Sequence, residues 1–225
     1  MTHELIERSP RGYIQIPQFP GTVIATHLTH LQKTLPGTLK ALVDENQKLS
    51  PMPHFMTHRE NVRKSMLEEM QLFYADGSRV EESYDLYKQY FGYNGSVGTW
   101  LDAKFIKEGL WYIETDLRIS AEGFSGRRHP LDRTTLHEEA YVDLEFNSQG
   151  LPIRKSILQS FLAEKNIYFH PPAHNWVAVF ASDVSCAGMG SSNPNERYPS
   201  RGALAIIGGL DLQIKNLNIG GKNES

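Results

Sequence analysis

Hydrophobic positions in the first part of the chain recur at the spacing of amphipathic helices. In residues 26–47, leucines recur at intervals of three and four, which places them on one helical face: Leu28, Leu31, Leu35, Leu39 and Leu42. Pro36 and Gly37 must kink or split this helix, because proline removes a backbone hydrogen bond. The pattern therefore predicts helical structure with a break at the Pro-Gly pair.

A second helix is predicted over residues 57–75. Thr57 is followed three residues later by Glu60, which is the spacing of a capping box, and apolar residues continue along one face to residue 73. The proline-containing segment before Thr57 is interpreted as a linker. His54 and His58 are therefore assigned to the linker and to the first helical turn.

From Gly95 onward the pattern changes to the period of two that is typical of strands. Residues 109–123 alternate apolar and polar side chains, as in a half-buried strand, and residues 138–150 alternate in the same way. Residues 151–166 instead show apolar positions at helical spacing after Pro152. Strands are expected again after residue 166 and near the C-terminus, separated by a loop over 186–202 that is rich in glycine, serine and proline.

These patterns predict an α+β fold with a single domain over residues 1–225. Residues 1–94 form an extended arm plus a helical part, which ends with a short tyrosine-rich helix, and residues 95–225 form a β-rich part. We expect the N-terminal helices to pack on a mostly antiparallel β-sheet or barrel. A double-stranded β-helix barrel is the more specific version, and a strand–helix–strand sheet layer is its rival. Regular βαβ alternation is missing, which disfavours Rossmann and TIM-barrel designs.

Composition and charge exclude several classes of partner. The formal net charge of −3 argues against nucleic acid as the main partner, since phosphate neutralisation requires a basic surface. The single cysteine, Cys186, excludes an intrachain disulfide and cysteine-rich zinc sites. The N-terminus lacks an apolar signal region, and the longest apolar runs, such as 176–181, are too short to span a membrane. We therefore expect a cytoplasmic protein with no membrane partner.

The candidate metal site lies where a predicted strand begins. Residues i and i+2 of a strand point to the same side, so His137 and Glu139 can converge on one ion, with His174 or His170 as third ligand. An imidazole and a carboxylate are two thirds of the facial triad of non-haem Fe(II) enzymes. This constellation resembles the ligand motif of cupin-like and 2-oxoglutarate-dependent oxygenases. The resemblance implies Fe(II) or another divalent transition metal.

The same resemblance implies a cation that pairs with the carboxylate of a cosubstrate. Those enzymes place it shortly after the last histidine, whereas Arg197 and Arg201 come later in this chain, across the loop 186–202. We assign cosubstrate binding to Arg197 or Arg201, with His137 and Arg201 as catalytic residues and the loop as a lid. The interval from His137 to His174 is also shorter than is usual in the oxygenases.

The polar segment 125–139 is a second source of site residues. Arg127, Arg128 and Arg133 carry guanidinium groups that match carboxylate or phosphate groups in bidentate geometry. Histidines and a carboxylate in the same segment, His129, Asp132 and His137, can alternatively supply general acid–base groups.

Three functions therefore stay open. The first is a small-molecule enzyme with a mononuclear metal site of the oxygenase or cupin type. The second is a non-enzymatic structural or binding protein that forms a homo-oligomer through the extended arm, residues 12–26, in which Pro17 and Pro20 interrupt β-branched residues. The third is a metal-free acid–base enzyme, such as an isomerase or cyclase. The first and third require a small-molecule ligand.

Overall fold

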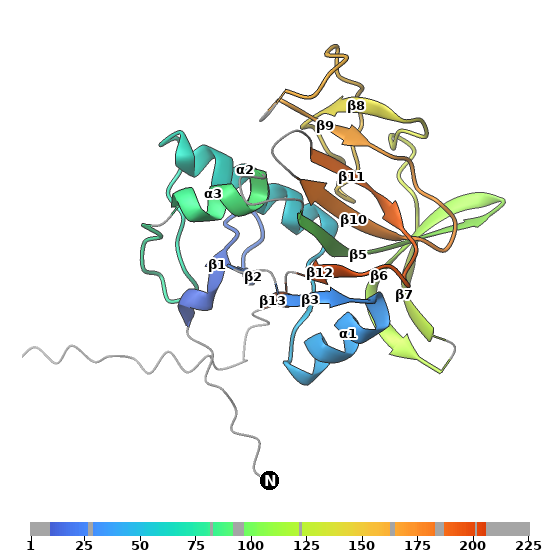
Figure 1. Cartoon of the computed structure of the whole chain (residues 1–225), viewed down its shortest axis with the longest axis horizontal. Helices are drawn as coiled ribbons and strands as arrows, with labels where there is room; N and C mark the ends of the chain where they lie inside the picture. The colour runs from blue at the N-terminus through green and yellow to red at the C-terminus, as the bar shows by residue number, and fades with distance from the viewer. Residues whose placement is uncertain are drawn as a thin grey trace, which may run out of the picture.

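The computed structural model of the chain describes residues 10–26, 29–81, 83–91, 97–121, 123–162, 165–182, 187–200 and 202–205. Helices are few and strands are many, as the sequence predicts for an α+β protein (Figure 1). In chain order the elements are the 3-10 helix Pro10–Gly12, β1 Tyr13–Gln15, β2 Thr22–Ala25, β3 Thr29–Lys33, α1 Leu35–Asp44, β4 Lys48–Leu49, α2 Met52–Met66, α3 Ser83–Phe91, β5 Val97–Glu108, β6 Leu110–Ser120, β7 Gly123–Pro130, β8 Ala140–Asp143, β9 Asn166–Phe169, β10 Val177–Ser182, β11 Ala187–Ser192, β12 Tyr198–Ser200 and β13 Gly202–Ala205.

The strands form two open sheets. The larger sheet has the order β3-β12-β5-β10-β11-β9-β8, and the hairpin β6-β7 branches from β5. Most of its pairs are antiparallel, while β12 with β5 and β11 with β9 are parallel. The smaller sheet has the order β1-β2-β13-β4. No pairing between the described strands closes either sheet into a barrel, so the prediction of a mostly antiparallel sheet is confirmed and its barrel version is not found.

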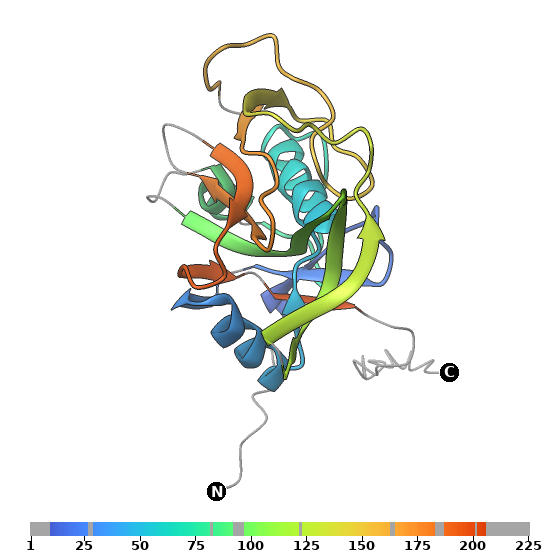
Figure 2. The same cartoon turned by 90° about the vertical axis from the view of Figure 1, so that its right-hand side faces the viewer.

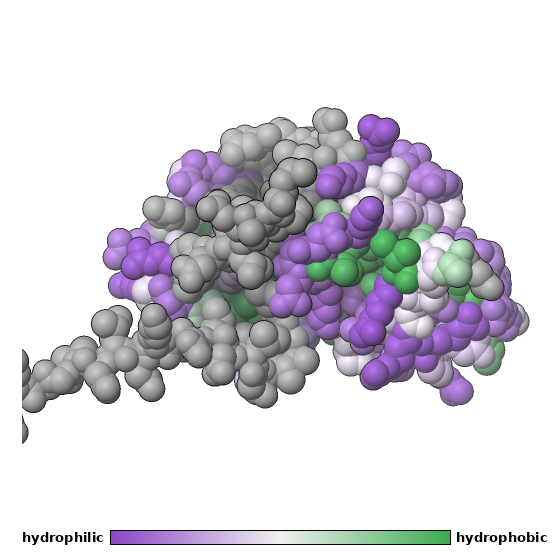
Figure 3. Space-filling view, turned by 90° about the horizontal axis from the view of Figure 1, so that it is seen from below, coloured by the Kyte–Doolittle hydropathy of each residue, from purple (hydrophilic) through white to green (hydrophobic). Residues whose placement is uncertain are grey.

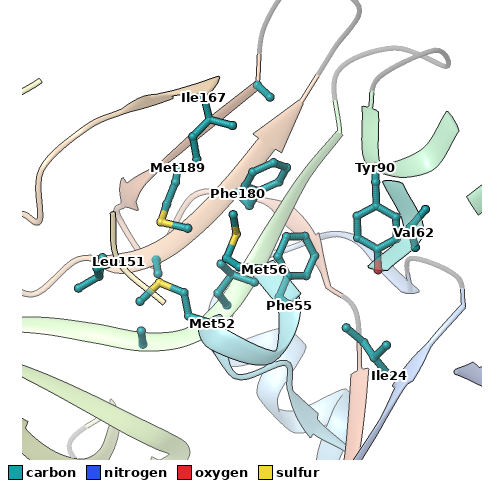
Figure 4. Close-up of a cluster of buried hydrophobic side chains, with 14 of the residues drawn as sticks. Ile24, Met52, Phe55, Met56, Val62, Tyr90, Leu151, Ile167, Phe180 and Met189 are labelled. Atoms are coloured by element: carbon teal, nitrogen blue, oxygen red, sulfur yellow. The ribbon is translucent and has the colours of Figure 1, made fainter. Parts of the chain in front are cut away.

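Both faces of the central strands β5 and β10 are buried. Alternate side chains of β5 enter two different cores: Trp100 packs with Leu39 and Leu42 of α1, while Leu101 and Phe105 pack with the residues around α2. Figure 2 shows α2 beside the sheet and α1 below it. The larger core gathers methionine and aromatic side chains between α2, α3 and the strands (Figure 4). The sheet is therefore covered from two sides.

The leucine-rich segment 26–47 is split by its proline rather than bent. Residues 29–33 form β3, and α1 begins at Leu35 with Pro36 in its first turn. Proline is tolerated there because the N–H that it lacks has no partner in the first turn of a helix. Leu35, Leu39 and Leu42 are buried as the pattern predicts, but Leu31 belongs to a strand.

Helix α2 begins earlier than the capping-box pattern predicts. It starts at Met52, with Pro53 in its first turn, and it ends at Met66. Thr57 and Glu60 therefore lie inside the helix, and the predicted cap is wrong. The proline-containing segment does not form a linker, because Pro51 is the N-cap residue and Pro53 stands in the first helical turn, where neither costs a helical hydrogen bond. His54 and His58 consequently lie one turn apart on α2.

The helix predicted over residues 151–166 is absent from the described residues of that segment. The backbone instead binds the outer edge of β8: the N–H of Ser156 donates to the carbonyl of Tyr141 at 2.8 Å, and the N–H of Asp143 donates to Arg154 at 3.3 Å. Ile157 is 92% exposed, so the apolar positions at helical spacing do not share a buried face. Hydrogen bonding to the open edge of β8 therefore outweighs the helix propensity of these residues.

The predicted loop over 186–202 is largely strand. Residues 187–192 form β11 in the interior of the sheet, and residues 198–200 form β12. Glycines fit there because the neighbouring chain is close: a Cβ on Gly190 would lie 3.0 Å from the Cβ of His170. β11 lies between β10 and β9, so residues 187–192 do not form a lid, and Cys186 lies outside the described residues.

The predicted arm is folded onto its own chain. β1 and β2 form a hairpin with Tyr13 paired to Ala25, and β2 also pairs with β13. The apolar side chains of this hairpin are buried, which leaves them unavailable to a partner: Tyr13, Ile14, Ile16, Val23, Ile24 and Ala25. Oligomer formation through the arm stays a prediction that the single chain does not test.

The described part of the face seen from below is mostly hydrophilic. Figure 3 shows a compact hydrophobic patch on it, in the region of α1, next to hydrophilic residues. Val43 of α1 is 65% exposed. None of the helices within the described ranges is long and apolar enough to cross a membrane.

A tight turn holds the start of α2 against the strands. The side chain of Asn147 accepts hydrogen bonds from the N–H groups of Gln149 and Leu151, both at 3.0 Å. Gly150 has a φ of 80°, in the left-handed region, and a Cβ at this position would lie 2.6 Å from the backbone nitrogen of Pro53. Only glycine therefore satisfies both the turn and the packing.

We expect Gly150→Ala to destabilise the protein by about 3 kcal/mol or more, because left-handed strain and backbone overlap add together. Gly77→Ala is the matched control, since Gly77 has a φ of 82° with no heavy atom within 4 Å of the added Cβ. The control should cost only about 1 kcal/mol. Denaturant unfolding measures both values, and equal losses would contradict the close contact with α2.

Candidate functional site

The larger sheet forks at β5. One edge of β5 pairs with β12 at Trp100 and with β6 over residues 104–108. Asp102 lies between these two pairings. Its N–H donates to the carbonyl of Ser50 at 3.0 Å, which ties the fork to the segment that precedes α2.

The carboxylate of Asp102 satisfies two backbone groups where β6 leaves β5. Its Oδ2 accepts from the N–H of Asp116 and its Oδ1 accepts from the N–H of Leu117, both at 2.9 Å. Asp116 has a φ of 54°, and the pairing of β6 with β7 shifts register between Thr115 and Arg118. This is a β-bulge, which leaves the two N–H groups outside the regular ladder. Asp102 therefore takes the place of a neighbouring strand.

A pocket opens beside this carboxylate, with a volume of about 390 Å³, and we call it the fork pocket. Asp102 of β5 is one of its lining residues, the first turn of α2 forms one wall, and β6, β7 and the turn before Gly150 form the others. The residues that line it are Pro51, Met52, Pro53, His54, Asp102, Ile113, Thr115, Asp116, His129, Ser148 and Gln149. Its size lies in the range of small-molecule sites.

Burial raises the pKa of Asp102 from 3.8 to about 6, because the carboxylate loses hydration. The two backbone hydrogen bonds oppose this increase, the carboxylate of Asp116 adds to it, and the ammonium of Lys48 opposes it. Lys48 binds Asp116 directly, with 3.1 Å between Nζ and Oδ1. Asp102 is only 2% exposed and carries a carboxyl group that exchanges its proton close to neutral pH.

His54 has the opposite shift. Burial, and then the charge of Lys48, lower the pKa of His54 from 6.5 to about 4. The positive end of the α2 dipole acts in the same direction. The ring packs on Phe19 with 4.0 Å between centroids, and its buried Nδ1 has no hydrogen-bond partner among the described residues. His54 is therefore neutral at pH 7 and retains one unpartnered nitrogen.

The fork pocket therefore combines a proton-exchanging carboxyl group with a neutral imidazole. Groups with opposite pKa shifts in one cleft are the signature of acid–base sites, because catalysis needs a pKa near the working pH. Asp102 can accept or return a proton, and the neutral His54 does not compete for it. Ile113 and Met52 add apolar surface that limits access of water.

The residues of the predicted metal site have other partners. Oε1 of Glu139 lies 3.2 Å from Nδ1 of His170, and Oε2 accepts from the hydroxyl of Tyr168 at 3.2 Å. Burial and the bond to Glu139 raise the pKa of Tyr168. Glu139 and His170 are thus brought together, but on an exposed part of β8 and β9 rather than in a cavity.

His174 and His137 lie elsewhere. Nδ1 of His174 accepts from the backbone N–H of Lys107 at 3.0 Å, and its Nε2 lies 2.9 Å from Nδ2 of Asn175. These two contacts of His174 hold the corner before β10, where Asn175 adopts a left-handed φ of 62°. The ring of His137 is exposed and stacks at 6.4 Å from Trp111.

The donor atoms do not assemble around a common point. Across the described ranges, no group of three or more His, Cys, Asp or Glu side chains is arranged to hold a metal ion. The divalent metal at His137, Glu139 and His174 stays a prediction that no further contact among the described residues supports. Arg197 is exposed in the turn between β11 and β12, and Arg201 lies outside the described residues.

Sequence patterns overlook the residues that matter most here. Asp102 stands in the alternating stretch of β5 between Trp100 and Lys104, and a carboxylate is unusual in a buried strand. That single feature is the signal that the sequence offers. His129 lies in the polar segment that the sequence does assign to acid–base chemistry, and it lines the fork pocket. The assignment of His54 to a linker hides its position on α2.

Comparisons with known proteins add no family to this geometry. No protein-family model, no curated protein and no solved structure matches the chain. The site is therefore argued from its own residues.

The two pKa shifts predict opposite pH dependences of stability. Between pH 4 and 6, Asp102 holds its proton more in the folded state than in the unfolded state. Its contribution to the free energy of unfolding is therefore fully present below pH about 4 and is lost as pH rises through about 6. His54 contributes stability above pH about 6.5 that is lost as pH falls through about 4. The Asp102 shift corresponds to about 3 kcal/mol. The His54 shift corresponds to less, about 2 kcal/mol, because solvent reaches part of the ring and screens its charge, so the two slopes largely cancel in the wild type.

Single variants should reveal each slope. We expect the free energy of unfolding of the wild type, relative to that of Asp102→Asn, to fall by about 3 kcal/mol from pH 4 to 6. The variant lacks the carboxyl group whose contribution the wild type loses over this range. For His54→Phe, which keeps the ring contact with Phe19, the corresponding difference should change by about 2 kcal/mol in the opposite sense. Urea unfolding at several pH values measures both. Parallel curves for all three proteins would show that neither shift exists.

Proposed function

We propose that the chain is a metal-free acid–base enzyme that binds a small molecule in the fork pocket and transfers a proton through Asp102. The observation that carries this proposal is a carboxyl group only 2% exposed, with a pKa of about 6, in the lining of a pocket of about 390 Å³. Isomerisation by proton transfer is the reaction class that this arrangement favours.

The roles follow from the environment of each residue. Asp102 removes a proton from the bound molecule and returns it at another atom. The two backbone N–H groups keep its oxygens fixed, so the second lone pair of each oxygen has a defined direction. His54, which stays neutral, does not compete for the transferred proton, and Lys48 pairs with Asp116.

A second candidate is a binding protein that uses the same pocket without chemistry. The observation that favours it is that both oxygens of Asp102 already accept backbone hydrogen bonds, which is a complete structural role. Proton exchange with a ligand separates the two candidates, because binding alone leaves the ligand unlabelled. The oxygenase hypothesis lacks a comparable observation, since the predicted ligands do not meet.

Solvent deuterium provides a test that works before the substrate is identified. The protein is incubated in D₂O with pools of small carbonyl compounds, and loss of C–H signals is followed by proton NMR. We expect at least one compound to gain deuterium, and its exchange rate to fall by about 10²- to 10⁴-fold in Asp102→Asn. The wild-type rate should also fall below pH about 6, as Asp102 becomes protonated.

Asp85→Asn is the control variant. Asp85 is an exposed carboxylate on α3 that pairs with Lys88 at 2.8 Å, and it does not line the fork pocket. This variant should exchange at the wild-type rate. A compound that binds in the fork pocket but gains no deuterium would support the binding protein, and an unchanged rate in Asp102→Asn would refute the role of Asp102.

A further inference from the structure

The hairpin of β6 and β7 has two faces with different neighbours. Residues that lie opposite each other on two antiparallel strands have their side chains on the same face. Leu117 and Phe124 pack on one face, in the core beside α1. On the other face, Ile113 is paired with His129, and both line the fork pocket together with Thr115. One face of the hairpin therefore covers a core, and the other forms a wall of the fork pocket.

Two arginines stand on the fork-pocket face of this hairpin. Arg127 is paired with Thr115, and Arg118 is paired with Ser125 on the far side of the bulge. Since residues 125, 127 and 129 share one face of β7, both arginine side chains start from the face that carries His129. Both are exposed, and neither lines the pocket itself. We call Arg118 and Arg127, which stand beside the fork pocket, the arginine pair.

The arginine pair differs from the neighbouring Arg128 in its partners. Arg128 projects from the opposite face of β7, where it binds Glu114 at 3.1 Å and Glu108 at 2.8 Å. No hydrogen bond or ion pair joins Arg118 or Arg127 to a carboxylate within the described ranges. Arg128 therefore has a structural role, whereas the guanidinium groups of the arginine pair are available to a ligand.

The charges on this side of the fork pocket sum to a positive value. Burial acts to raise the pKa of Asp116, but the hydrogen bond and charge of Lys48 and the charges of Arg127 and Arg118 lower it overall. Lys48 already pairs with Asp116 at 3.1 Å. Even when Asp102 is ionised, these three cations and two carboxylates leave one positive charge in excess. An anion that approaches the arginine pair is therefore attracted.

The chemistry of the guanidinium group defines the kind of anion that fits. Guanidinium stays charged at neutral pH, and its planar N–H groups match the oxygens of a carboxylate or a phosphate in bidentate geometry. The arginine pair extends from neighbouring strands, so one anionic group can contact both side chains. The pocket beside it has the volume of a small-molecule site, about 390 Å³.

We infer that the arginine pair binds an anionic group, a carboxylate or a phosphate, of a molecule whose remaining part lies in the fork pocket. The substrate class is then a small carbonyl compound that carries such a group. This assignment of a substrate rests on the proposed function, whereas anion binding by the arginine pair does not. Arg118 and Arg127 determine specificity, since they hold the substrate and take no part in the proton transfer.

The test uses inorganic phosphate and acetate as probes, which separate the two kinds of anion. Each is titrated into the full chain at neutral pH, with sodium chloride keeping the ionic strength constant, and backbone amide shifts are followed by NMR. We expect saturable shifts at residues 115–118 and 125–129, with a Kd on the order of 10 mM for at least one probe. Arg127→Gln should weaken binding by about three- to tenfold, and the double variant with Arg118→Gln should abolish it.

Arg79→Gln is the matched control. Arg79 is an exposed arginine that lies outside the β6–β7 hairpin and does not line the fork pocket. This variant should bind both probes as the wild type does. Shifts that map elsewhere, shifts that do not saturate, or an unchanged affinity in Arg127→Gln would each overturn the inference.

Deuterium exchange separates this inference from the proposed function. For an anionic carbonyl compound, Arg127→Gln should raise the half-saturating concentration by about three- to tenfold and leave the maximal exchange rate within about twofold of the wild type. If the probes bind as expected but no compound gains deuterium, the anion site stands and the acid–base role of Asp102 fails. If only uncharged compounds gain deuterium and neither probe binds, the proposed function stands and this inference fails.

Discussion

The fold depends on β5, which pairs with three neighbouring strands. β5 pairs with β10 along one edge and is shared between β12 and β6 along the other, so its second edge must divide. At a division of this kind, backbone N–H groups lose their ladder partners, and leaving them buried and unbonded is costly. The Asp102 carboxylate supplies both acceptors. The same carboxylate is buried in the interior. Asp102 therefore both accepts the hydrogen bonds of the two backbone N–H groups and has a raised pKa.

Secondary structure is predictable here where the local pattern and the tertiary environment agree. The presence of β6 and the buried leucines of α1 follow from periodicity, although the bulge at Asp116 breaks the alternation of burial along β6. Residues 151–162 show where this reasoning fails, since the exposed edge of β8 binds their backbone. Sequence spacing contains no information about an unpaired edge elsewhere in the chain. The start of α2 escapes prediction for a different reason, because Pro51 and Pro53 suggest an interruption although proline is acceptable in a first turn.

The candidate site is less predictable than the fold. The sequence directs attention to histidines near carboxylates, such as His137 and Glu139, but their side chains are exposed and have other neighbours. The fork pocket is assembled from the start of α2, three strands and a turn, which are far apart in the chain. Asp102 offers only the signal of a carboxylate within an otherwise apolar strand, and His54 offers none. Their pKa shifts arise from burial, which is a property of the assembled chain.

The position of β13 has a consequence for the order of events during synthesis. Residues 202–205 insert between β2 and β4, so these two strands are synthesised well before the strand that joins them. Until then, the β1–β2 hairpin presents an uncompleted edge, and its buried residues Val23 and Ile24 lack their final cover. Pairings that join distant parts of a chain form slowly and leave intermediates prone to association. The nascent chain should therefore depend more on chaperones than the finished protein does.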